Sequence, residues 1–146
     1  MITDSSAIET NSKEVSIDTK QNICTFSGNA EVIYDKNGKS NVLKADRITI
    51  YYNEKNLKSP KKIIADGKVF FTNDEFTVNS SSCEFDTKVI KFKENVKIKN
   101  KELGEIEADS ATYNIDEKKI DIDSKKMVSV KVNQKTSEKI DKISKN

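Results

Sequence analysis

The chain contains no histidine among its 146 residues. This absence removes the commonest general base, the commonest transition-metal ligand and every catalytic triad that uses histidine. Proline is nearly absent as well, occurring once at Pro60. No apolar run approaches the roughly 18 residues that a transmembrane helix requires, so no membrane span is expected.

Cysteine and arginine are also scarce. The two cysteines, Cys24 and Cys83, allow at most one intramolecular disulfide and form no CxxC motif. Arg47 is the only arginine, and the lysines are interspersed with acidic residues at a net charge of +2. Lysine is poorly suited to bidentate recognition of phosphates or bases, so no nucleic-acid partner is expected.

The amino terminus shows no export signal, because residues 1–6 lack a basic stretch followed by an apolar one. The chain is therefore either cytosolic or a mature exported chain to which an initiator methionine was added. Hydrophobic and charged residues each make up 34% of the sequence. Such a lean chain still folds if its apolar residues are spaced so that one face collects them.

Alternation of apolar and polar residues is the main structural signal. Segments of period two recur at 48–52, 89–93, 96–99, 120–123 and 128–132. In a β-strand this spacing places apolar side chains on one face and charged ones on the other. No segment before residue 134 has a convincing helical period, so an all-β fold is predicted.

A longer pattern repeats at 43–52, 76–85 and 106–115. In each copy the apolar or small residues are spaced by 2, 3, 2 and 2 positions. The first copy has Leu43, Ala45, Ile48, Ile50 and Tyr52 at these positions. Because the step of three interrupts the alternation, it predicts a bulge or corner that keeps both halves of a strand facing one core.

A second pattern alternates with the first, at 24–34, 65–71, 90–98 and, more weakly, 120–130. Polar residues interrupt its two alternating halves, and several of them tolerate a positive φ angle. These are Gly28, Asn29, Gly67 and Asn95. Segments rich in Asp, Asn, Gly and Lys join the units and are typical of hairpin turns.

The chain is therefore predicted to form about four bent hairpins of roughly 30 residues each. Stacked hairpins of this kind predict an antiparallel jelly roll, or a flattened solenoid-like barrel. We expect a disordered segment at 1–10, one domain at 11–132 and a polar tail at 133–146 that is frayed or forms a short helix. The connection 53–62 is the expected flexible loop.

Several segments resemble sequence elements of OstA-like (LptA) lipopolysaccharide-transport proteins. They are ICTFSGNA at 23–30, LKADRI at 43–48, IADGKV at 64–69 and GEIEAD at 104–109. The family elements that they resemble are f-x-G-N-V, a-D-x-i-x-Y and G-x-i-x-A-D. Their order and repetition, over about residues 10–132, are more specific than any single element.

The resemblance implies a periplasmic, non-enzymatic carrier that passes lipopolysaccharide from the inner to the outer membrane of Gram-negative bacteria. It implies a twisted antiparallel jelly roll that is open at both ends. These ends would pair, strand to strand, with further copies and with the inner- and outer-membrane components of the export bridge. No cofactor or metal is implied, and the signal peptide is taken to have been removed. The two cysteines depart from the family pattern.

The interior apolar face is the candidate ligand site, where the resemblance places the acyl chains of lipid A. Its expected residues are Phe26, Val32, Ile48, Ile50, Val69, Phe71, Phe85, Phe92, Val96, Ile98, Tyr113 and Ile115. Ala111 and Ile122 are expected on the same face. Large aromatic residues alternate there with alanines, which favours a groove. A plain packed core is the alternative, because side chains fill most inward positions of small sheets.

Four other residues are candidates for chemistry. Cys24 and Cys83 both fall on the inward face, either as buried free thiols or as a disulfide. Asp46 and Asp109 occupy matching corners of the repeat, where hydrogen bonds to backbone amides are expected rather than a metal or catalytic role.

Lysines expected near the rim are either solvated or in contact with lipid phosphates. They are Lys44, Lys68 and Lys97.

Two other classes of function compete with the carrier. An adaptor domain of the same export machinery, either the inner-membrane anchor or the outer-membrane assembly protein, would carry a membrane helix upstream or a long barrel downstream. A glycosidase on a jelly roll would need a paired carboxylate site in a cleft, and the sequence does not single out such a pair.

Overall fold

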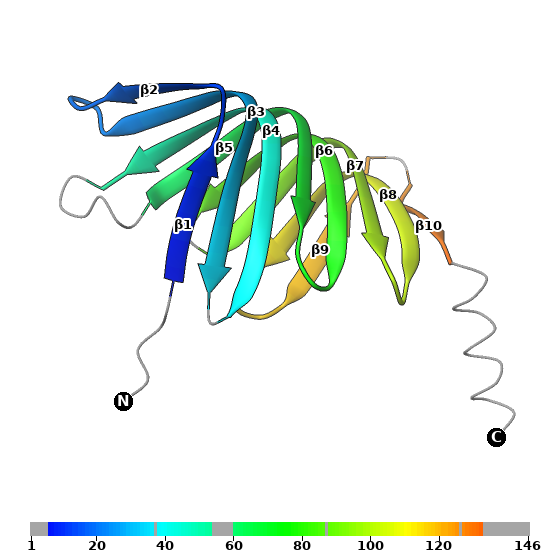
Figure 1. Cartoon of the computed structure of the whole chain (residues 1–146). Coiled ribbons are helices and arrows are strands. Elements are labelled where there is room, and N and C mark those ends of the chain that lie inside the picture. The colour runs from blue at the N-terminus through cyan, green and yellow to red at the C-terminus, as the bar shows by residue number, and fades with distance from the viewer. Residues whose placement is uncertain (1–5, 37, 54–59, 87, 126, 133–146) are drawn as a thin grey trace, which may run out of the picture.

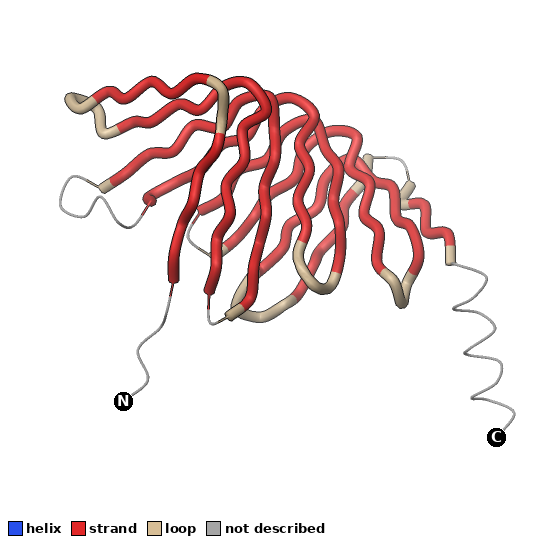
Figure 2. The backbone as a smooth tube through the Cα atoms, viewed as in Figure 1, coloured by secondary structure: helices blue, strands red, loops and turns tan. Residues whose placement is uncertain are grey.

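A computed structural model describes residues 6–36, 38–53, 60–86, 88–125 and 127–132. Every regular element in these residues is a β-strand (Figure 2). The strands are β1 Ser6–Asn11, β2 Glu14–Asp18, β3 Ile23–Lys36, β4 Lys39–Tyr52, β5 Pro60–Thr72, β6 Phe76–Asp86, β7 Val89–Asn100, β8 Gly104–Asn114, β9 Lys119–Asp123 and β10 Ser129–Lys131. The all-β prediction is thereby confirmed.

All ten strands belong to one antiparallel sheet in which β3 to β8 pair in sequence order. The first and last long strands each pair with two short ones: β1 and β2 both pair with β3, and β9 and β10 both pair with β8. Figure 1 shows β1 and β2 at one end of this array and β10 at the opposite end. Among the described residues no pairing joins the two ends, so the sheet is open and not closed into a barrel.

Each long strand is bent at its middle by a shift in register. The shifts fall between Ser27 and Ala30 on β3 and between Lys44 and Arg47 on β4, and they continue across β5 to β8. Such a bulge bends the strand and increases its twist. The predicted corner is therefore confirmed, at the step of three in the repeat.

The line of bulges divides the sheet into two half-sheets that fold over one another (Figure 1). Half-sheet I contains β2, β9 and the segments 23–27, 47–52, 60–66, 82–86, 89–93 and 110–114. Half-sheet II contains β1, β10 and the segments 30–36, 39–45, 69–72, 76–80, 96–100 and 104–108. We call the side opposite the bulges, where the two half-sheets end, the mouth.

Pairs of consecutive residues with positive φ form the bend on alternate strands. They are Gly28 and Asn29 on β3, Gly67 and Lys68 on β5, and Glu94 and Asn95 on β7. Glycine and asparagine adopt this conformation readily, and the sequence predicted them here. Lysine and glutamate do not favour a positive φ angle. Lys68 and Glu94 nevertheless adopt it in the bulge, each beside a residue that does favour it, Gly67 or Asn95.

Apolar residues run in rows across the sheet and form the core between the half-sheets. On half-sheet I, one row joins residues that are register partners from strand to strand. It reads Val15, Phe26, Ile48, Ala65, Cys83, Phe92, Ala111 and Ile122. A matching row on half-sheet II begins at the polar Thr10 and continues with the apolar residues Val32, Leu43, Phe71, Val78, Ile98, Ile106 and Val130.

The two half-sheets are staggered, so that a strand of half-sheet II faces a later strand of half-sheet I. The Tyr34 ring on β3 lies 6.1 Å from the Phe85 ring on β6. The Phe76 ring on β6 lies 4.7 Å from the Tyr113 ring on β8, measured between centroids. At the end formed by β1 and β2, part of half-sheet I is therefore not covered by half-sheet II. At the end formed by β10, part of half-sheet II is not covered by half-sheet I.

The structure differs from the predicted boundaries in three places. β1 begins at Ser6, within the segment expected to be disordered, because pairing with β3 satisfies its backbone groups. β5 begins at Pro60, which the sequence assigned to a flexible loop; proline is tolerated as the first residue of a strand. The fourth, weaker repeat is not one bent strand but two short ones, β9 and β10.

The predictions for residues 1–5, 54–59 and 133–146 lie outside the described residues.

Candidate functional site

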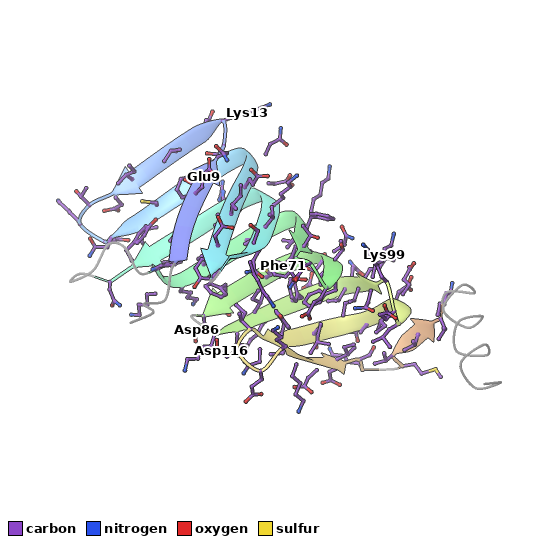
Figure 3. The ribbon with its side chains drawn as sticks, turned by 60° about the horizontal axis from the view of Figure 1, so that its bottom comes forward. Glu9, Lys13, Phe71, Asp86, Lys99 and Asp116 are labelled. Carbon is purple, nitrogen blue, oxygen red and sulfur yellow. The ribbon has the colours of Figure 1, made fainter. Side chains whose placement is uncertain are left out.

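The twelve predicted ligand-binding residues all face the space between the half-sheets. Ten of them are buried: Phe26, Val32, Ile48, Ile50, Val69, Phe71, Phe92, Val96, Ile98 and Tyr113. The other two, Phe85 and Ile115, are half-buried and pack against this core, as does Ile122. Figure 3 shows Phe71 in the interior, whereas Glu9, Lys13 and Lys99 lie on the periphery. The interior placement is confirmed, while a role in ligand binding stays a prediction.

Several further residues of the same interior were not among the twelve expected ligand contacts. They are Leu43, Ile63, Phe76, Val78, Ile90 and Ile106, all of which are buried. Each occupies an inward position of the same alternating pattern, so the spacing could have identified them. The interior is correspondingly better filled than the sequence suggested.

Aromatic side chains join the two half-sheets through the middle of the interior. Phe71 of half-sheet II lies 5.7 Å from Phe92 and 6.5 Å from Tyr113, both of half-sheet I. Phe76 meets Tyr113 edge to face, with an interplanar angle of 85°. Aromatic pairs of this kind contribute about 0.5–1.5 kcal/mol each beyond the area that they bury.

An apolar cavity of about 30 Å³ lies behind the mouth. Its walls come from both half-sheets and are formed by Val32, Tyr34, Asn41, Leu43, Ile63, Phe71, Phe85, Ile90 and Ile115. A cavity of this size exceeds the roughly 10–15 Å³ that one water molecule needs, but it is far too small for an acyl chain. An acyl chain would fit between the half-sheets only if they moved apart.

The interior surface continues into solvent at both ends of the sheet. At the end formed by β1 and β2, Val15 and Ile17 of half-sheet I are 54% and 67% exposed. At the opposite end, Val130 of β10 is 55% exposed on half-sheet II. These residues extend the apolar rows of the core, and the stagger between the half-sheets leaves them uncovered.

Cys24 and Cys83 are both free thiols. They lie on β3 and β6, three strand spacings apart, which corresponds to about 14 Å. A disulfide requires Cα atoms within about 7 Å, so the alternative of an intramolecular bridge is excluded. Burial raises the pKa of the Cys83 thiol to about 12 and also raises the pKa of Cys24. Both side chains are neutral packing groups at physiological pH.

The two corner aspartates have structural surroundings. The Asp109 carboxylate accepts a hydrogen bond of 2.8 Å from the Lys125 backbone N–H, as predicted for a corner residue. The Asp46 carboxylate lies over Gly67, where a Cβ atom would come within 2.5 Å of its Oδ2. In the described part of the chain, no group of three or more metal-ligating side chains is arranged to hold a metal ion.

The lysines expected near the rim are placed elsewhere. Lys44 pairs with Glu31 at 3.7 Å, and Lys97 pairs with Glu105 at 3.3 Å, on the outer face of half-sheet II. Alternation directs these side chains outward, because their neighbours in sequence point into the core. Lys68 lies at the bend, with positive φ. None of the three lies at the mouth.

The edge of the mouth instead carries a different set of polar side chains. Lys118 Nζ, after β8, lies 3.9 Å from Glu75 Oε1, before β6. Tyr113 lies beside this pair; burial, and to a smaller extent the charge of Glu75, raises the pKa of its hydroxyl. The neighbouring Lys39 lowers the pKa of Lys118. These residues come from opposite half-sheets and bridge the mouth.

A family model described as "LptA/(LptD N-terminal domain) LPS transport protein" matches residues 9–141. The chain belongs to this family. Membership assigns it to lipopolysaccharide transport, and it confirms the resemblance seen in the four sequence elements. No curated protein matches the chain in a sequence comparison.

A solved structure with the same fold is LptH from Pseudomonas aeruginosa, described as the LptA-homologous periplasmic component of the lipopolysaccharide transport device. The two structures align with a TM-score of 0.73 at 10% sequence identity, over 87% of this chain and 95% of that chain. The likeness confirms the jelly-roll architecture of this LptA/LptD-N family member. In the described residues, no helix is long and apolar enough to cross a membrane.

Proposed function

We propose that this chain is a non-enzymatic periplasmic carrier that binds the acyl chains of lipopolysaccharide between its half-sheets. The observation that supports this role is the continuity of the apolar interior. The row on half-sheet I reaches the exposed Val15 at one end of the sheet, and the row on half-sheet II reaches the exposed Val130 at the other. A protein with a closed core would bury such rows completely. A protein that transfers a lipid to the next protein needs apolar surface that is exposed at its ends. Each Å² of apolar ligand surface buried there contributes about 25 cal/mol.

Photo-crosslinking at two tyrosines tests the binding site. Tyr34 lies at the mouth and lines the interior cavity, whereas Tyr51 is directed to the outer face of half-sheet I, where it lies near Lys62. Benzoylphenylalanine at position 34 is expected to form adducts with lipopolysaccharide, and the same group at position 51 is expected to form none. Equal labelling at both positions would contradict an interior site.

A charge at the half-buried Phe85 provides the matching loss-of-function test. Phe85→Asp places a carboxylate in the apolar cavity wall, and its desolvation is expected to weaken lipopolysaccharide binding by about tenfold or more. Thr112→Asp adds the same charge on the outer face and serves as the control. Circular dichroism confirms that both variants are folded. Normal adduct formation in Phe85→Asp would count heavily against the carrier role.

We also propose that copies of the chain join end to end within a protein bridge. β1 and β2 form the edge at one end and β9 and β10 the edge at the other, and edge strands present unpaired backbone groups. Because the strands alternate in direction, β10 of one copy would run antiparallel to β1 of the next. The uncovered part of half-sheet I would meet the uncovered part of half-sheet II.

Concentration-dependent light scattering tests this assembly. The native chain is expected to grow in mass with concentration, as strand addition predicts. Ile17→Lys places a charge on the exposed edge of β2 and is expected to weaken association by about tenfold. Thr49→Lys, on the outer face of the sheet, should leave association unchanged. A native chain that stays strictly monomeric at all concentrations would overturn the proposal.

An adaptor role in the same machinery is the second candidate, because the matching family model also includes the LptD amino-terminal domain. The full sequence of the encoding gene distinguishes the two. A long barrel-forming region downstream would identify the adaptor.

A further inference from the structure

The two half-sheets are joined very differently on their two sides. Along the bend the backbone runs continuously from one half-sheet to the other in each of six strands, β3 to β8. Across the mouth, within the described ranges, no strand pairing joins half-sheet I to half-sheet II. Among the described residues, only side chains hold the mouth closed. It is therefore the side on which the half-sheets can separate, with the bend acting as the hinge.

Side-chain contacts across the mouth are concentrated toward the β8 side. There Glu75 pairs with Lys118, and Phe76 packs edge to face on the Tyr113 ring at 4.7 Å. We call these four residues the clasp. The clasp combines an ion pair with an aromatic contact. Its half-sheet II members are further tied down, because Asn100 Nδ2 donates to the Glu75 carbonyl at 2.9 Å.

The part of the mouth nearer β3 is closed by a longer ring contact than that of the clasp. Its ring contact is between Tyr34 and Phe85, whose centroids are 6.1 Å apart and whose planes are tilted by 51°. Both side chains are half-buried, and directly behind them lies the apolar cavity. We call Tyr34 and Phe85 the lips. The cavity thus lies behind the longer of these two ring contacts across the mouth.

We propose that lipopolysaccharide acyl chains enter sideways between the lips, while the clasp keeps the rest of the mouth shut. This inference rests on the proposed carrier function. A cavity of about 30 Å³ has to enlarge to hold an acyl chain, and separation of the lips enlarges it directly. The clasp confines the opening to one part of the trough, so the remaining core stays packed while the ligand is loaded.

Reversible crosslinks across the mouth test the proposal in the full chain. The background carries Cys24→Ser and Cys83→Ala, so that no native thiol reacts. One variant adds Tyr34→Cys and Phe85→Cys across the lips, and a matched variant adds Glu75→Cys and Lys118→Cys across the clasp. A short bismaleimide with a cleavable disulfide links each pair, and loading of fluorescently labelled lipopolysaccharide is followed in time.

Linking the lips is expected to slow loading by about tenfold or more, and cleavage of the linker is expected to restore it in the same sample. Linking the clasp should leave the rate within about twofold of the unlinked variant. Asn41→Cys with Ile115→Cys spans the same cavity and provides a second lock that keeps both aromatic lips.

Three results would overturn the inference. If a crosslink across the lips, with either cysteine pair, leaves the loading rate unchanged, the ligand enters elsewhere, for example through the open ends. Loading that stops when the clasp is linked means that the whole mouth opens. A background protein that binds no labelled lipopolysaccharide before any link is made contradicts the carrier function itself, which separates that failure from a failure of the gate.

Discussion

Replacing Phe92 with alanine is expected to lower the free energy of unfolding by about 3–5 kcal/mol. Phe92 is 0% exposed, and its ring lies 5.7 Å from that of Phe71 on the opposite half-sheet. Its register partners are Cys83 and Ala111, which are both small. The neighbours therefore cannot close the cavity that alanine leaves. Urea unfolding followed by circular dichroism measures the loss.

Phe70→Ala is the matched control for this substitution. Phe70 lies next to Phe71 on β5 but faces outward from half-sheet II, opposite Lys44. It is half-buried, so its truncation is expected to cost only about 1 kcal/mol. If Phe92→Ala cost no more than Phe70→Ala, the interior would not be the packed core that the structure shows. The same reasoning makes Phe85, and not Phe92, the suitable position for a charge in binding experiments.

Gly67→Ala is expected to destabilise the fold by about 2–3 kcal/mol, through two separate effects. Gly67 has a φ angle of +82°, which costs an alanine about 1–2 kcal/mol. In addition, the new Cβ would come within 2.5 Å of Asp46 Oδ2, so the carboxylate would have to move. The destabilisation is measured by urea unfolding, as for Phe92→Ala.

Gly38→Ala separates the two effects, because its φ angle of +78° is similar and no atom lies within 4 Å of the added Cβ. We expect it to cost only the backbone part, about 1–2 kcal/mol. Asp46→Ala in the Gly67→Ala background should then restore stability to about the level of Gly38→Ala. Equal costs for the two glycine variants, with no rescue, would show that the approach of Asp46 to the bend carries no energy.

The strands and the bend could be predicted from the sequence because both are local. Alternation between neighbours decides which face Ile48, Ile50 or Phe92 occupies. The step of three around Asp46 and Asp109 marks the bulge, since an odd step reverses the facing unless the chain bends. The same alternation also places Leu43 and Ile63 on the inner face, where both are buried.

The arrangement at the mouth could not be predicted, because it depends on how one half-sheet lies over the other. Phe76 and Tyr113 are 37 positions apart in the chain, and they meet only because twist staggers the half-sheets. Glu75 and Lys118 lie in segments whose composition predicts turns but does not predict that these two turns lie close together. Lys44 and Lys97 were expected near the rim for the same reason: a sequence shows which face a lysine occupies, but not where the sheet ends.

The stagger between the half-sheets has a consequence for transport. One end of the sheet exposes half-sheet I at Val15 and Ile17, and the opposite end exposes half-sheet II at Val130. If copies join through these surfaces, a reversed copy cannot fit, because like halves would meet. The assembly then has an inherent polarity, and the two membrane components that cap it must present unlike surfaces, one imitating each half. Direction along the route would thus be set by the shape of a single protomer.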